Sequence, residues 1–579
     1  MASSACSERT SIIRPTNGAR SRSPARDKIA MKKEPRTKDD DADRKDDVHQ
    51  ERRQVAAGNY YSGRYRRIAW ATIAFMCWCL IQSAMRKPLP TPGASLDSRY
   101  NINSNAIFPF VDELETEFNR NSDAHIDNLQ CISWRATVGC TPDGPHVGNK
   151  RTPSLQGFFH RDWPCAKKLP ALAGGSGYCE MQTETGEMVK VFQKGCYEGY
   201  PLRTAKFTAS FSCDMAASFL KYKNRMMNFK PTEPMAFSGY AVPSRGIVMQ
   251  VFGKVLPSAY SIVRILRDVH GCDLPIELWS LAGEVTKSDP VVRQLLDLPD
   301  INLRTIHDTS IKSYMSKLYS IVYSQFDQVL WLDSDNFPFR DPSFLFETAE
   351  FEQTGSMFWK DYWKPQQNDF YITKHSLAWE LFDIPPDSPI RNEMELEAGQ
   401  FVIDRRRTKK ALHALLFLTL TFKEIIQPLD ILLGDKDLFK FAFHATKTPF
   451  HYIEKPPGYA GYAAPPLMRS DAVCGQTMIQ PDPAGDPLFF HRNMAKIGSR
   501  KALKRVWEKG LMFKNGNSEA EYHTEMWPSL WRLCMCFYPK NPSIYEELDF
   551  GEGSEVEQFE EKLLFYADEA LSILDNEKR

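Results

Sequence analysis

The sequence predicts an α/β fold built on a Rossmann-type, mostly parallel sheet. Three short apolar runs, at 246–251, 275–279 and 328–332, have the length and composition of buried strands. Two segments with apolar residues at helical spacing, 259–269 and 311–324, lie between them. Strands that alternate with helices in this way are joined by right-handed crossovers and run parallel. Ligands bind such sheets at the carboxyl ends of the strands, so we expect the functional site there.

The chain is too long to form a single hydrophobic core. It has 579 residues, with 73 Lys+Arg and 73 Asp+Glu, so we expect at least two folded units and flexible tails. The balanced charge gives no reason to expect a nucleic-acid partner. Residues 1–67 are rich in Arg, Lys, Ser and Asp and contain few aliphatic clusters, which predicts a disordered tail.

Residues 68–85 (IAWATIAFMCWCLIQSAM) form a long uncharged segment near the N-terminus. A helix of this length spans about 27 Å, which suits a thin membrane. A charged tail precedes the segment, whereas a cleaved signal peptide starts closer to the N-terminus, so we expect a transmembrane signal-anchor helix. Lys and Arg are more frequent before the segment than after it. The positive-inside rule therefore places the tail in the cytosol and the rest of the chain in the lumen.

Prolines and polar segments over 86–130 predict a stem that separates the membrane from a globular head. Six cysteines follow between Cys131 and Cys213, with spacings that fit no zinc site. A luminal environment permits disulfides. We therefore expect 131–240 to form a small disulfide-stabilised module, and its pairing cannot be deduced from the sequence.

Asp333 and Asp335 directly follow the apolar run 328–332. An Asp-x-Asp turn at a strand end supplies the one or two carboxylates that Mg²⁺ or Mn²⁺ takes from a protein, and leaves other positions for water and phosphate oxygens. A turn held by Asx-type hydrogen bonds is the structural alternative. Copies of the tripeptide at 39–41 and 41–43 lie in the polar tail without a preceding strand, so we interpret them as solvated charge.

Several longer motifs follow one another along the chain. In order they are GIV, LRDVHGCDLPIELW, VLWLDSDNFPFRDPSFLFE, GSMFWKDYW, EAGQFVIDRRR, GDKDLFKFAF and LFFHRNMAKIG. This ordered set resembles the fungal-type α-1,3-mannosyltransferase family of Golgi type II membrane enzymes. The resemblance implies a GT-A fold, a GDP-mannose donor, Mn²⁺ (or Mg²⁺) and transfer with retention of the α configuration. It covers residues 241 to about 500, and we place the catalytic domain at 241–510.

The resemblance also assigns roles to individual residues. It places His491, after the apolar run 487–490, in the metal site with Asp333 and Asp335. The bound cation would neutralise the diphosphate leaving group. A histidine after an apolar run is otherwise more often a satisfied core residue, and the resemblance favours the metal.

The aromatic segment 355–363 also carries a carboxylate. Sugars rest on aromatic rings and bind carboxylates, so we expect Trp359 and Asp361 to contact the donor; ordinary core aromatic residues are the alternative. The family pattern places Glu397 and Gln400 beside the donor sugar. A carboxylate there acts either as a nucleophile or as a stabiliser of an oxocarbenium-like centre, and the sequence does not choose between these.

Asp435 and Asp437 precede a helical pattern at 438–441, where carboxylates are favoured by the helix dipole and by free N–H groups. In the resembling family this segment borders the sugar site. We therefore expect one of the two to orient the mannose or the acceptor hydroxyl. Glu393 and Glu395 are interpreted instead as exposed helix charges.

Residues 511–579 match no motif of the family. Within them, 559–574 (FEEKLLFYADEALSIL) is spaced as an amphipathic helix. We expect a C-terminal helical extension, which either packs on the catalytic domain or pairs with another subunit in a homo- or hetero-oligomer.

Taken together, these features predict a metal-dependent retaining transferase, anchored in the Golgi membrane with its catalytic domain in the lumen. It would move mannose from GDP-mannose to a glycan acceptor, in α-1,3 linkage. One alternative is a retaining transferase on the same scaffold that uses a UDP-sugar, and donor preference separates the two. Another is a catalytically silent luminal scaffold or lectin-like protein, against which the intact Asp333, Asp335, Gln400 and His491 argue.

Overall fold

The structure is a computed structural model, and the residues that it describes belong to one compact unit, Arg99–Arg579. They are 129–138, 144–146, 152–153, 159–166, 169–170, 176–194, 210–313, 315–364, 377–385, 388–427, 432, 435–464, 471–529 and 534–577. The tail expected at 1–67 and the anchor expected at 68–85 lie outside them, as does nearly all of the expected stem. Within these ranges no helix has the length and apolarity needed to cross a membrane.

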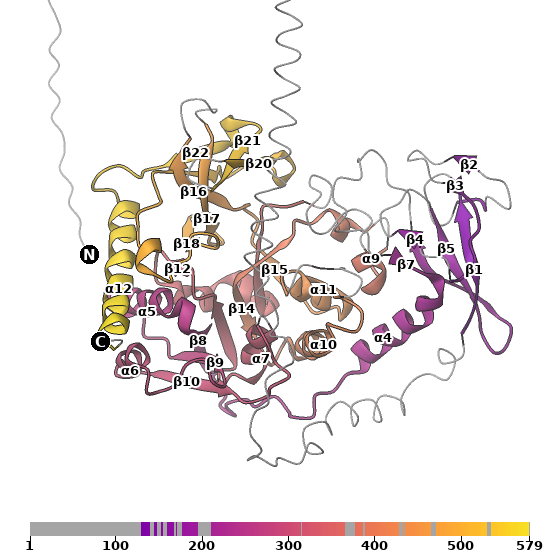
Figure 1. Cartoon of the computed structure of the whole chain (residues 1–579), viewed down its shortest axis with the longest axis horizontal. Coiled ribbons are helices and arrows are strands. Elements are labelled where there is room, and N and C mark those ends of the chain that lie inside the picture. The colour runs from indigo at the N-terminus through magenta and orange to yellow at the C-terminus, as the bar shows by residue number, and fades with distance from the viewer. Residues whose placement is uncertain are drawn as a thin grey trace, which may run out of the picture. The chain divides into compact units, whose positions relative to one another are not determined.

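The central sheet has seven strands in the order β10-β9-β8-β11-β14-β13-β15 (Figure 1). The strands are β8 (Arg245–Gln250), β9 (Ile276–Leu281), β10 (Ile301–Ile306), β11 (Gln328–Leu332), β13 (Ser356–Lys360), β14 (Leu396–Asp404) and β15 (His451–Tyr452). Only β14 runs against the others. The sheet is therefore mixed, and its parallel part contains the three strands expected from the apolar runs.

The crossover helices also lie where the apolar spacing predicts them. They are α5 (Leu256–Arg264), which continues as a π-helix over Ile265–Val269, and α7 (Met315–Tyr323). Strand β11 is buried along its whole length between β8 and β14, which explains its uninterrupted apolar sequence. The edge strand β10 was not predicted, because it alternates buried and exposed residues over a short span.

The remaining helices pack around this sheet. They are α4 (Ala216–Asn228), α6 (Pro290–Leu296), α8 (Ala349–Thr354), α9 (Leu377–Leu381), α10 (Lys409–Leu420), α11 (Leu438–Ala445) and α12 (Glu555–Glu577). Helix α11 begins directly after Asp437, as the pattern at 438–441 predicts. A short 3-10 helix, Pro342–Glu347, is capped by the Asp341 side chain, which accepts a hydrogen bond from the Ser343 N–H.

A second sheet of eight strands is antiparallel throughout. Its strands are β12 (Asn336–Pro338), β16 (Gly458–Ala463), β17 (Val473–Pro481), β18 (Pro487–His491), β19 (Lys509–Phe513), β20 (Thr524–Ser529), β21 (Cys534–Pro539) and β22 (Tyr545–Leu548). The order is β12-β18-β17-β16-β19-β22, and β21 joins β20 to β17. Segments on both sides of residue 510 therefore share one sheet. The segment 511–579 differs in this respect from the expected helical extension, since only its last part is a long helix.

Helix α12 contains the expected amphipathic segment 559–574 and packs along α5 (Figure 1). The Ser261 hydroxyl donates to the main-chain oxygen of Leu563 (2.7 Å), and the Arg264 guanidinium lies 3.2 Å from the Glu569 carboxylate. Of the two arrangements expected for this helix, the structure shows the one in which it packs on its own chain.

The cysteine-bearing module contains a three-stranded antiparallel sheet, β1-β5-β6, and helix α4. The strands of this sheet are β1 (Gln130–Thr137), β5 (Ser176–Gln182) and β6 (Met188–Lys194). Two short antiparallel pairs accompany it. In one, β2 (Thr152–Pro153) pairs with β3 (Phe159–His160), and in the other, β4 (Leu169–Pro170) pairs with β7 (Ser210–Phe211). Disulfides join Cys131 to Cys165 and Cys179 to Cys213. The expectation of disulfides in this region is confirmed for these four cysteines.

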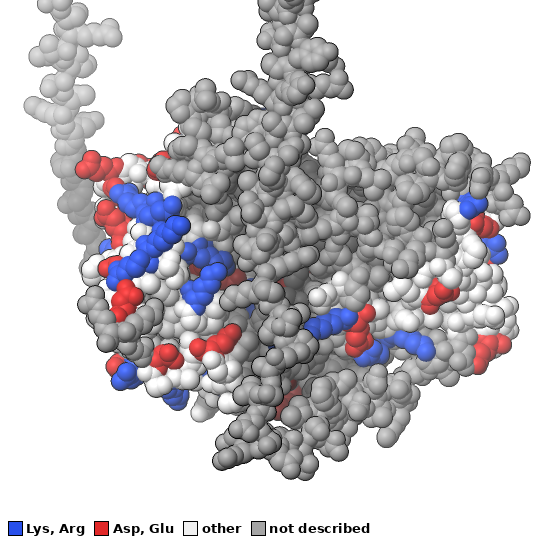
Figure 2. All heavy atoms as spheres, in the orientation of Figure 1, with Lys and Arg blue, Asp and Glu red and all other residues white. Residues whose placement is uncertain are grey.

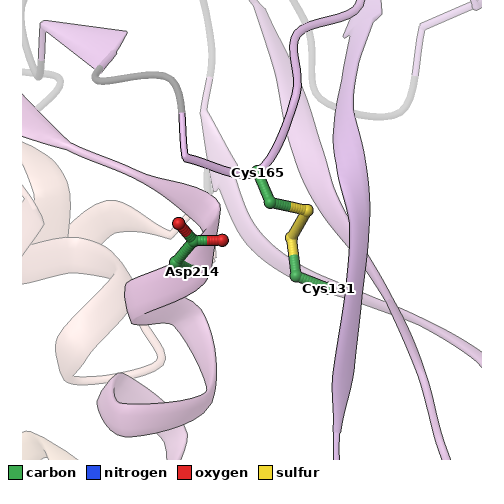
Figure 3. A group of neighbouring side chains, drawn as sticks. All are labelled: Cys131, Cys165 and Asp214. Atoms are coloured by element: carbon green, nitrogen blue, oxygen red, sulfur yellow. A yellow bond between two sulfur atoms is a disulfide. The ribbon is translucent and has the colours of Figure 1, made fainter.

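Asp214 lies beside the Cys131–Cys165 disulfide (Figure 3). The group has the residue types of a metal site, but the two sulfur atoms are bonded to each other. A metal ligand would have to be a thiolate, so this group is structural. A third disulfide, Cys474–Cys536, joins β17 to β21 in the second sheet.

Candidate functional site

The turn that carries Asp333 and Asp335 joins the two sheets, because β11 ends just before it and β12 begins just after it. The Asp333 N–H donates to the Gly399 main-chain oxygen (2.9 Å), and the Asn336 N–H donates to that of Asp333 (3.0 Å). The Trp331 indole N–H donates to Asp333 Oδ1 (2.8 Å). These bonds fix the turn at the carboxyl end of β11, where the sequence predicts the site.

His491 reaches this turn from the second sheet. It is the last residue of β18 and pairs with Asn336 of β12. The next N–H, that of Arg492, donates to the main-chain oxygen of Asp335 (2.9 Å). Ligand atoms of Asp333, Asp335 and His491 all lie within 4.8 Å of one another. The structure therefore brings together the three residues that the family resemblance assigns to a metal.

The side chains of this group include ligand atoms whose hydrogen bonding is not satisfied. Asp335 Oδ2 and both ring nitrogens of His491 are buried and make no hydrogen bond to any described residue. Lys496 Nζ lies 2.5 Å from Asp335 Oδ2, and Glu397 Oε1 lies 3.1 Å from His491 Nδ1, so these contacts are ion pairs without hydrogen-bond geometry. Two carboxylates and an imidazole are a donor set that Mn²⁺ accepts. The residues present fit a divalent cation.

The charges of the group depend on one another. Burial alone would lower the pKa of His491, but the carboxylates of Asp335 and Glu397 outweigh it and raise the pKa to about 10. Burial would raise the pKa of Asp335, yet His491 and Lys496 hold it below its usual range. The protonated imidazole therefore holds the carboxylates together in the metal-free protein. Metal binding has to displace that proton.

Strand β14 brings two of the expected catalytic residues to the same place. Glu397 Oε1 accepts a hydrogen bond from the Gly399 N–H (2.8 Å) and faces His491. Gln400 is fully buried, and its Oε1 accepts from the Asn336 side-chain amide (2.6 Å). Glu397 is therefore in contact with the metal residues, whereas Gln400 supports the turn through Asn336.

Gly399 marks the closest approach of β14 to the histidine. A Cβ atom at this position would lie 2.7 Å from His491 Nδ1 and 3.0 Å from Glu397 Oε1. We expect Gly399→Ala to displace the imidazole and to weaken the binding of a divalent cation by about tenfold to a hundredfold. The measurement is the Mn²⁺ affinity of the folded variant, with its melting temperature recorded. Gly253→Ala is the control, because a Cβ atom there would have no neighbouring atom within 4 Å, and equal affinity of the two variants would contradict the expectation.

Lys317, for which the sequence indicated no role, lies beside Asp333 and Asp435. Its ammonium lies 3.0 Å from Asp333 Oδ1 and 3.4 Å from Asp435 Oδ2, and it donates to the Ala398 main-chain oxygen (2.7 Å). Burial would lower the pKa of Lys317, but Asp333 and Asp435 raise it. The available signal was a lysine on the buried face of α7, because a buried ammonium requires an anionic partner.

Lys436 occupies the centre of a second charged group. Its ammonium lies 2.5 Å from Asp361 Oδ2 and 2.6 Å from Glu395 Oε2. Burial raises the pKa of Asp361 to about 6, against the effect of the lysine. Asp361 thus lies in a buried charged group beyond the end of β13, and no role was expected for Lys436 from the sequence.

The interpretation of Glu393 and Glu395 as exposed helix charges is wrong. The short helix before them ends at residue 392, and β14 begins directly after them at Leu396. Glu395 is fully buried, and Glu393 lies 3.0 Å from the His444 imidazole. The acidic spacing resembled a helix, but the chain is extended here because Glu395 has to reach Lys436.

Asp435 and Asp437 point to different partners. Asp435 contacts Lys317, and burial raises its pKa. Asp437 Oδ1 accepts from the Leu396 N–H (2.9 Å) and lies 3.6 Å from Lys440 Nζ. Asp435 therefore belongs with the metal residues, and Asp437 ties α11 to the start of β14.

Trp359 lies in the core between the two sheets. Its side chain has no exposed surface, its indole N–H donates to the Pro481 main-chain oxygen (2.6 Å), and its ring packs edge-on against Phe489. Of the two interpretations given to this aromatic segment, the structure places Trp359 among the core aromatic residues. It presents no surface to a sugar.

An open pocket of 320 Å³ adjoins the metal residues through Lys496. Its lining includes Arg492, Met494, Lys496, Lys501 and Lys504, and none of the described residues that line it is acidic. Figure 2 shows Lys and Arg side chains gathered on the side of the molecule where α12 lies. Such a pocket attracts anions.

Part of the chain is similar to known mannosyltransferases. Residues 244–395 and 390–482 match the mannosyltransferase family model Mannosyl_trans3. The α-1,2-mannosyltransferase MNN5 of Saccharomyces cerevisiae is 23% identical over 332 residues, which cover 47% of this chain and 54% of the relative. The α-1,2-mannosyltransferase MNN21 of Candida albicans is 35% identical over 127 residues, which cover 19% of each chain. The chain thus spans about half or less of the length of these relatives. Neither of them supports the α-1,3 linkage.

Similarity to solved structures is low. The galactosyltransferase LgtC in complex with donor and acceptor sugar analogues shares 13% identity, with 36% of this chain and 73% of that chain covered and a TM-score of 0.26. The mannosyltransferase Ktr4p of S. cerevisiae in complex with GDP shares 11% identity, with 41% and 78% covered and a TM-score of 0.26. Scores this low establish neither a common fold nor a common function.

Proposed function

We propose that this protein is a metal-dependent mannosyltransferase that moves mannose from GDP-mannose to a glycan acceptor with retention of configuration. The observation that carries the proposal is the meeting of Asp333, Asp335 and His491 in one site, in a chain similar to α-1,2-mannosyltransferases. Because those relatives form α-1,2 linkages, we propose this linkage in place of α-1,3. A GT-A fold is part of the same proposal, supported by the mixed sheet and its Asp-x-Asp turn.

Asp333, Asp335 and His491 would hold Mn²⁺ or Mg²⁺, which when bound neutralises the charge that develops on the leaving diphosphate. Lys496 lies beside Asp335 with its side chain 48% exposed, so its ammonium is free to turn to a phosphate oxygen. Lys317 is buried between Asp333 and Asp435. Its role in the proposal is to keep both carboxylates in place.

Glu397, Gln400, Asp435 and Asp437 were expected to act at the sugar. Their contacts in the structure separate them into two pairs. Glu397 and Asp435 lie next to the metal group or its lysine, so we propose that they face the transferred mannose. A carboxylate in that position acts as a nucleophile or stabilises the oxocarbenium-like centre. Gln400 and Asp437 bond to Asn336 and to the Leu396 main chain. We assign them to positioning.

We propose that the enzyme works in the lumen of the Golgi as a single-pass type II membrane protein. The support is the apolar segment 68–85 together with three disulfides in the described part of the chain. Disulfides form and persist in compartments of the secretory pathway.

The test uses full-length protein from a host with an oxidising secretory pathway. Release of nucleotide from GDP-mannose and from UDP-sugars is measured with α-mannoside acceptors, in Mn²⁺, in Mg²⁺ and in EDTA, and the product is digested with an α-1,2-specific mannosidase. We expect turnover of GDP-mannose that EDTA removes, and a product that the mannosidase cleaves. Turnover of a UDP-sugar alone would overturn the mannose assignment, and a resistant product would overturn the linkage. No turnover of any donor would favour the silent scaffold.

A further inference from the structure

Arg492, the residue after the metal-group histidine, forms a buried ion pair with helix α12. Its guanidinium lies 3.1 Å from Glu560 Oε1, and neither side chain has any exposed surface. A buried charge without a partner is strongly unfavourable. The pair therefore fixes the end of β18 to a helix near the end of the chain.

The same two side chains hold both ends of the loop 492–507. Glu560 accepts hydrogen bonds from the main-chain N–H groups of Val506 (2.8 Å) and Trp507 (3.3 Å). The Arg492 guanidinium donates to the main-chain oxygens of Ala495 (3.1 Å) and Lys504 (3.4 Å). These four bonds give the loop a definite path between β18 and β19.

This loop contributes directly to the metal group and to the basic pocket. The Arg492 N–H donates to the Asp335 main-chain oxygen, and Lys496 on the loop pairs with the Asp335 carboxylate. Lys501 and Lys504 of the loop line the pocket. A change in the path of the loop would therefore move groups on both sides of Asp335.

We propose that Glu560 is a positioning residue for the cation and diphosphate site, and that it acts through Arg492. Helix α12 then contributes to metal affinity without supplying a ligand. The proposal rests on the metal site of the proposed function. It extends the active unit to a helix that lies well beyond the family match, which ends at residue 482.

Helix α12 also has contacts that do not involve the loop, and these provide a matched control. Glu569 pairs with Arg264 of α5, and the Leu563 main chain accepts from Ser261. Glu569→Gln removes a carboxylate from the same helix without touching loop 492–507. The loss of a carboxylate from α12 would by itself affect both variants, whereas a positioning role belongs to Glu560.

The experiment measures Mn²⁺ affinity of full-length Glu560→Gln, Glu560→Asp and Glu569→Gln by electron paramagnetic resonance, well below their melting temperatures. Amide hydrogen exchange of 492–507 is followed in the same metal-free proteins. We expect Glu560→Gln to weaken Mn²⁺ binding by about tenfold or more and to speed exchange over the loop. Glu560→Asp should recover part of the affinity because it keeps the charge, and Glu569→Gln should resemble the unchanged protein.

Equal Mn²⁺ affinity of Glu560→Gln and the unchanged protein would overturn the inference while leaving the proposed metal site intact. An equal loss in Glu560→Gln and Glu569→Gln would also overturn it, since the effect would then come from the loss of any carboxylate of α12 and not from the contacts of Glu560 with the loop. Failure of the unchanged protein to bind Mn²⁺ would overturn the metal site and the inference together. Binding of Mn²⁺ without transferase activity would overturn only the reaction assigned under the proposed function.

Discussion

Turnover of the sugar donor is expected to fall at least about a thousandfold when Asp335 is replaced by Asn. The substitution keeps the size of the side chain but removes the charge that faces His491 and Lys496. A metal that polarises a leaving group contributes several kcal/mol to the transition state, and each 1.4 kcal/mol, roughly, is a factor of ten. Steady-state turnover of the purified variant in saturating Mn²⁺ provides the measurement.

A neighbouring aspartate gives the matched control for this substitution. Asp341 lies in the segment that follows the turn and caps a short helix through its hydrogen bond to the Ser343 N–H. Asn caps helices about as well as Asp, so Asp341→Asn should keep both stability and turnover. Full activity of Asp335→Asn beside an intact control would show that this carboxylate does not hold the metal.

Replacing Lys436 with Met should reduce the free energy of unfolding by about 3 to 5 kcal/mol at pH 7.5. The lysine is the shared partner of Asp361 and Glu395, so its removal takes the ammonium charge away from two buried carboxylates. Methionine has a similar length and no charge, so the change tests the charge itself. Urea unfolding of the folded enzyme measures the difference, and Lys410→Met, at an exposed position of α10, is the control.

The cost of this substitution should decrease as the pH falls. Burial raises the pKa of Asp361 to about 6 in the folded protein, above the value of about 3.9 in an unfolded chain. A group with a raised folded-state pKa binds its proton first in the folded state, so its contribution to stability is lost as the pH rises through about 6. Lys436 lowers the pKa of Asp361 against the effect of burial, so without the lysine this pKa lies higher and the variant binds the proton at a higher pH than the unchanged protein. The variant therefore gains more stability as the pH falls from 7.5 to 5 and approaches the unchanged protein. A constant difference across this range would mean that Lys436 does not lower the pKa of Asp361.

The position of Asp333 and Asp335 at a strand end could be predicted because local sequence carries the signal. To place Asp333 and Asp335 at a strand end, it was enough to recognise that the apolar run before them is a buried strand and that the chain turns after it. His491 needed the family resemblance as well, since nothing near it in sequence shows that β18 ends beside β12. The pairing of Asn336 with His491 exists only in the folded protein.

The lysines could not be assigned in this way. Lys317, Lys436 and Lys496 gain their roles from burial and from carboxylates on other elements, and periodicity reports neither. Glu395 could not be placed correctly for the same reason. Its charge suggests an exposed side chain, but the ion pair with Lys436 makes its burial favourable. The second sheet was missed because four of its strand pairings join segments far apart in sequence.

The turn between β11 and β12, which joins the two sheets, also bears on how the molecule folds. Contacts between residues distant in sequence close large loops, and proteins rich in such contacts fold slowly. The metal group forms only after β18 has docked beside β12, so a nascent chain that has emerged only as far as residue 482 still lacks His491. We therefore expect a fragment that ends there to be exposed to aggregation and chaperone binding, because folding of this part of the chain depends on the residues that follow 482.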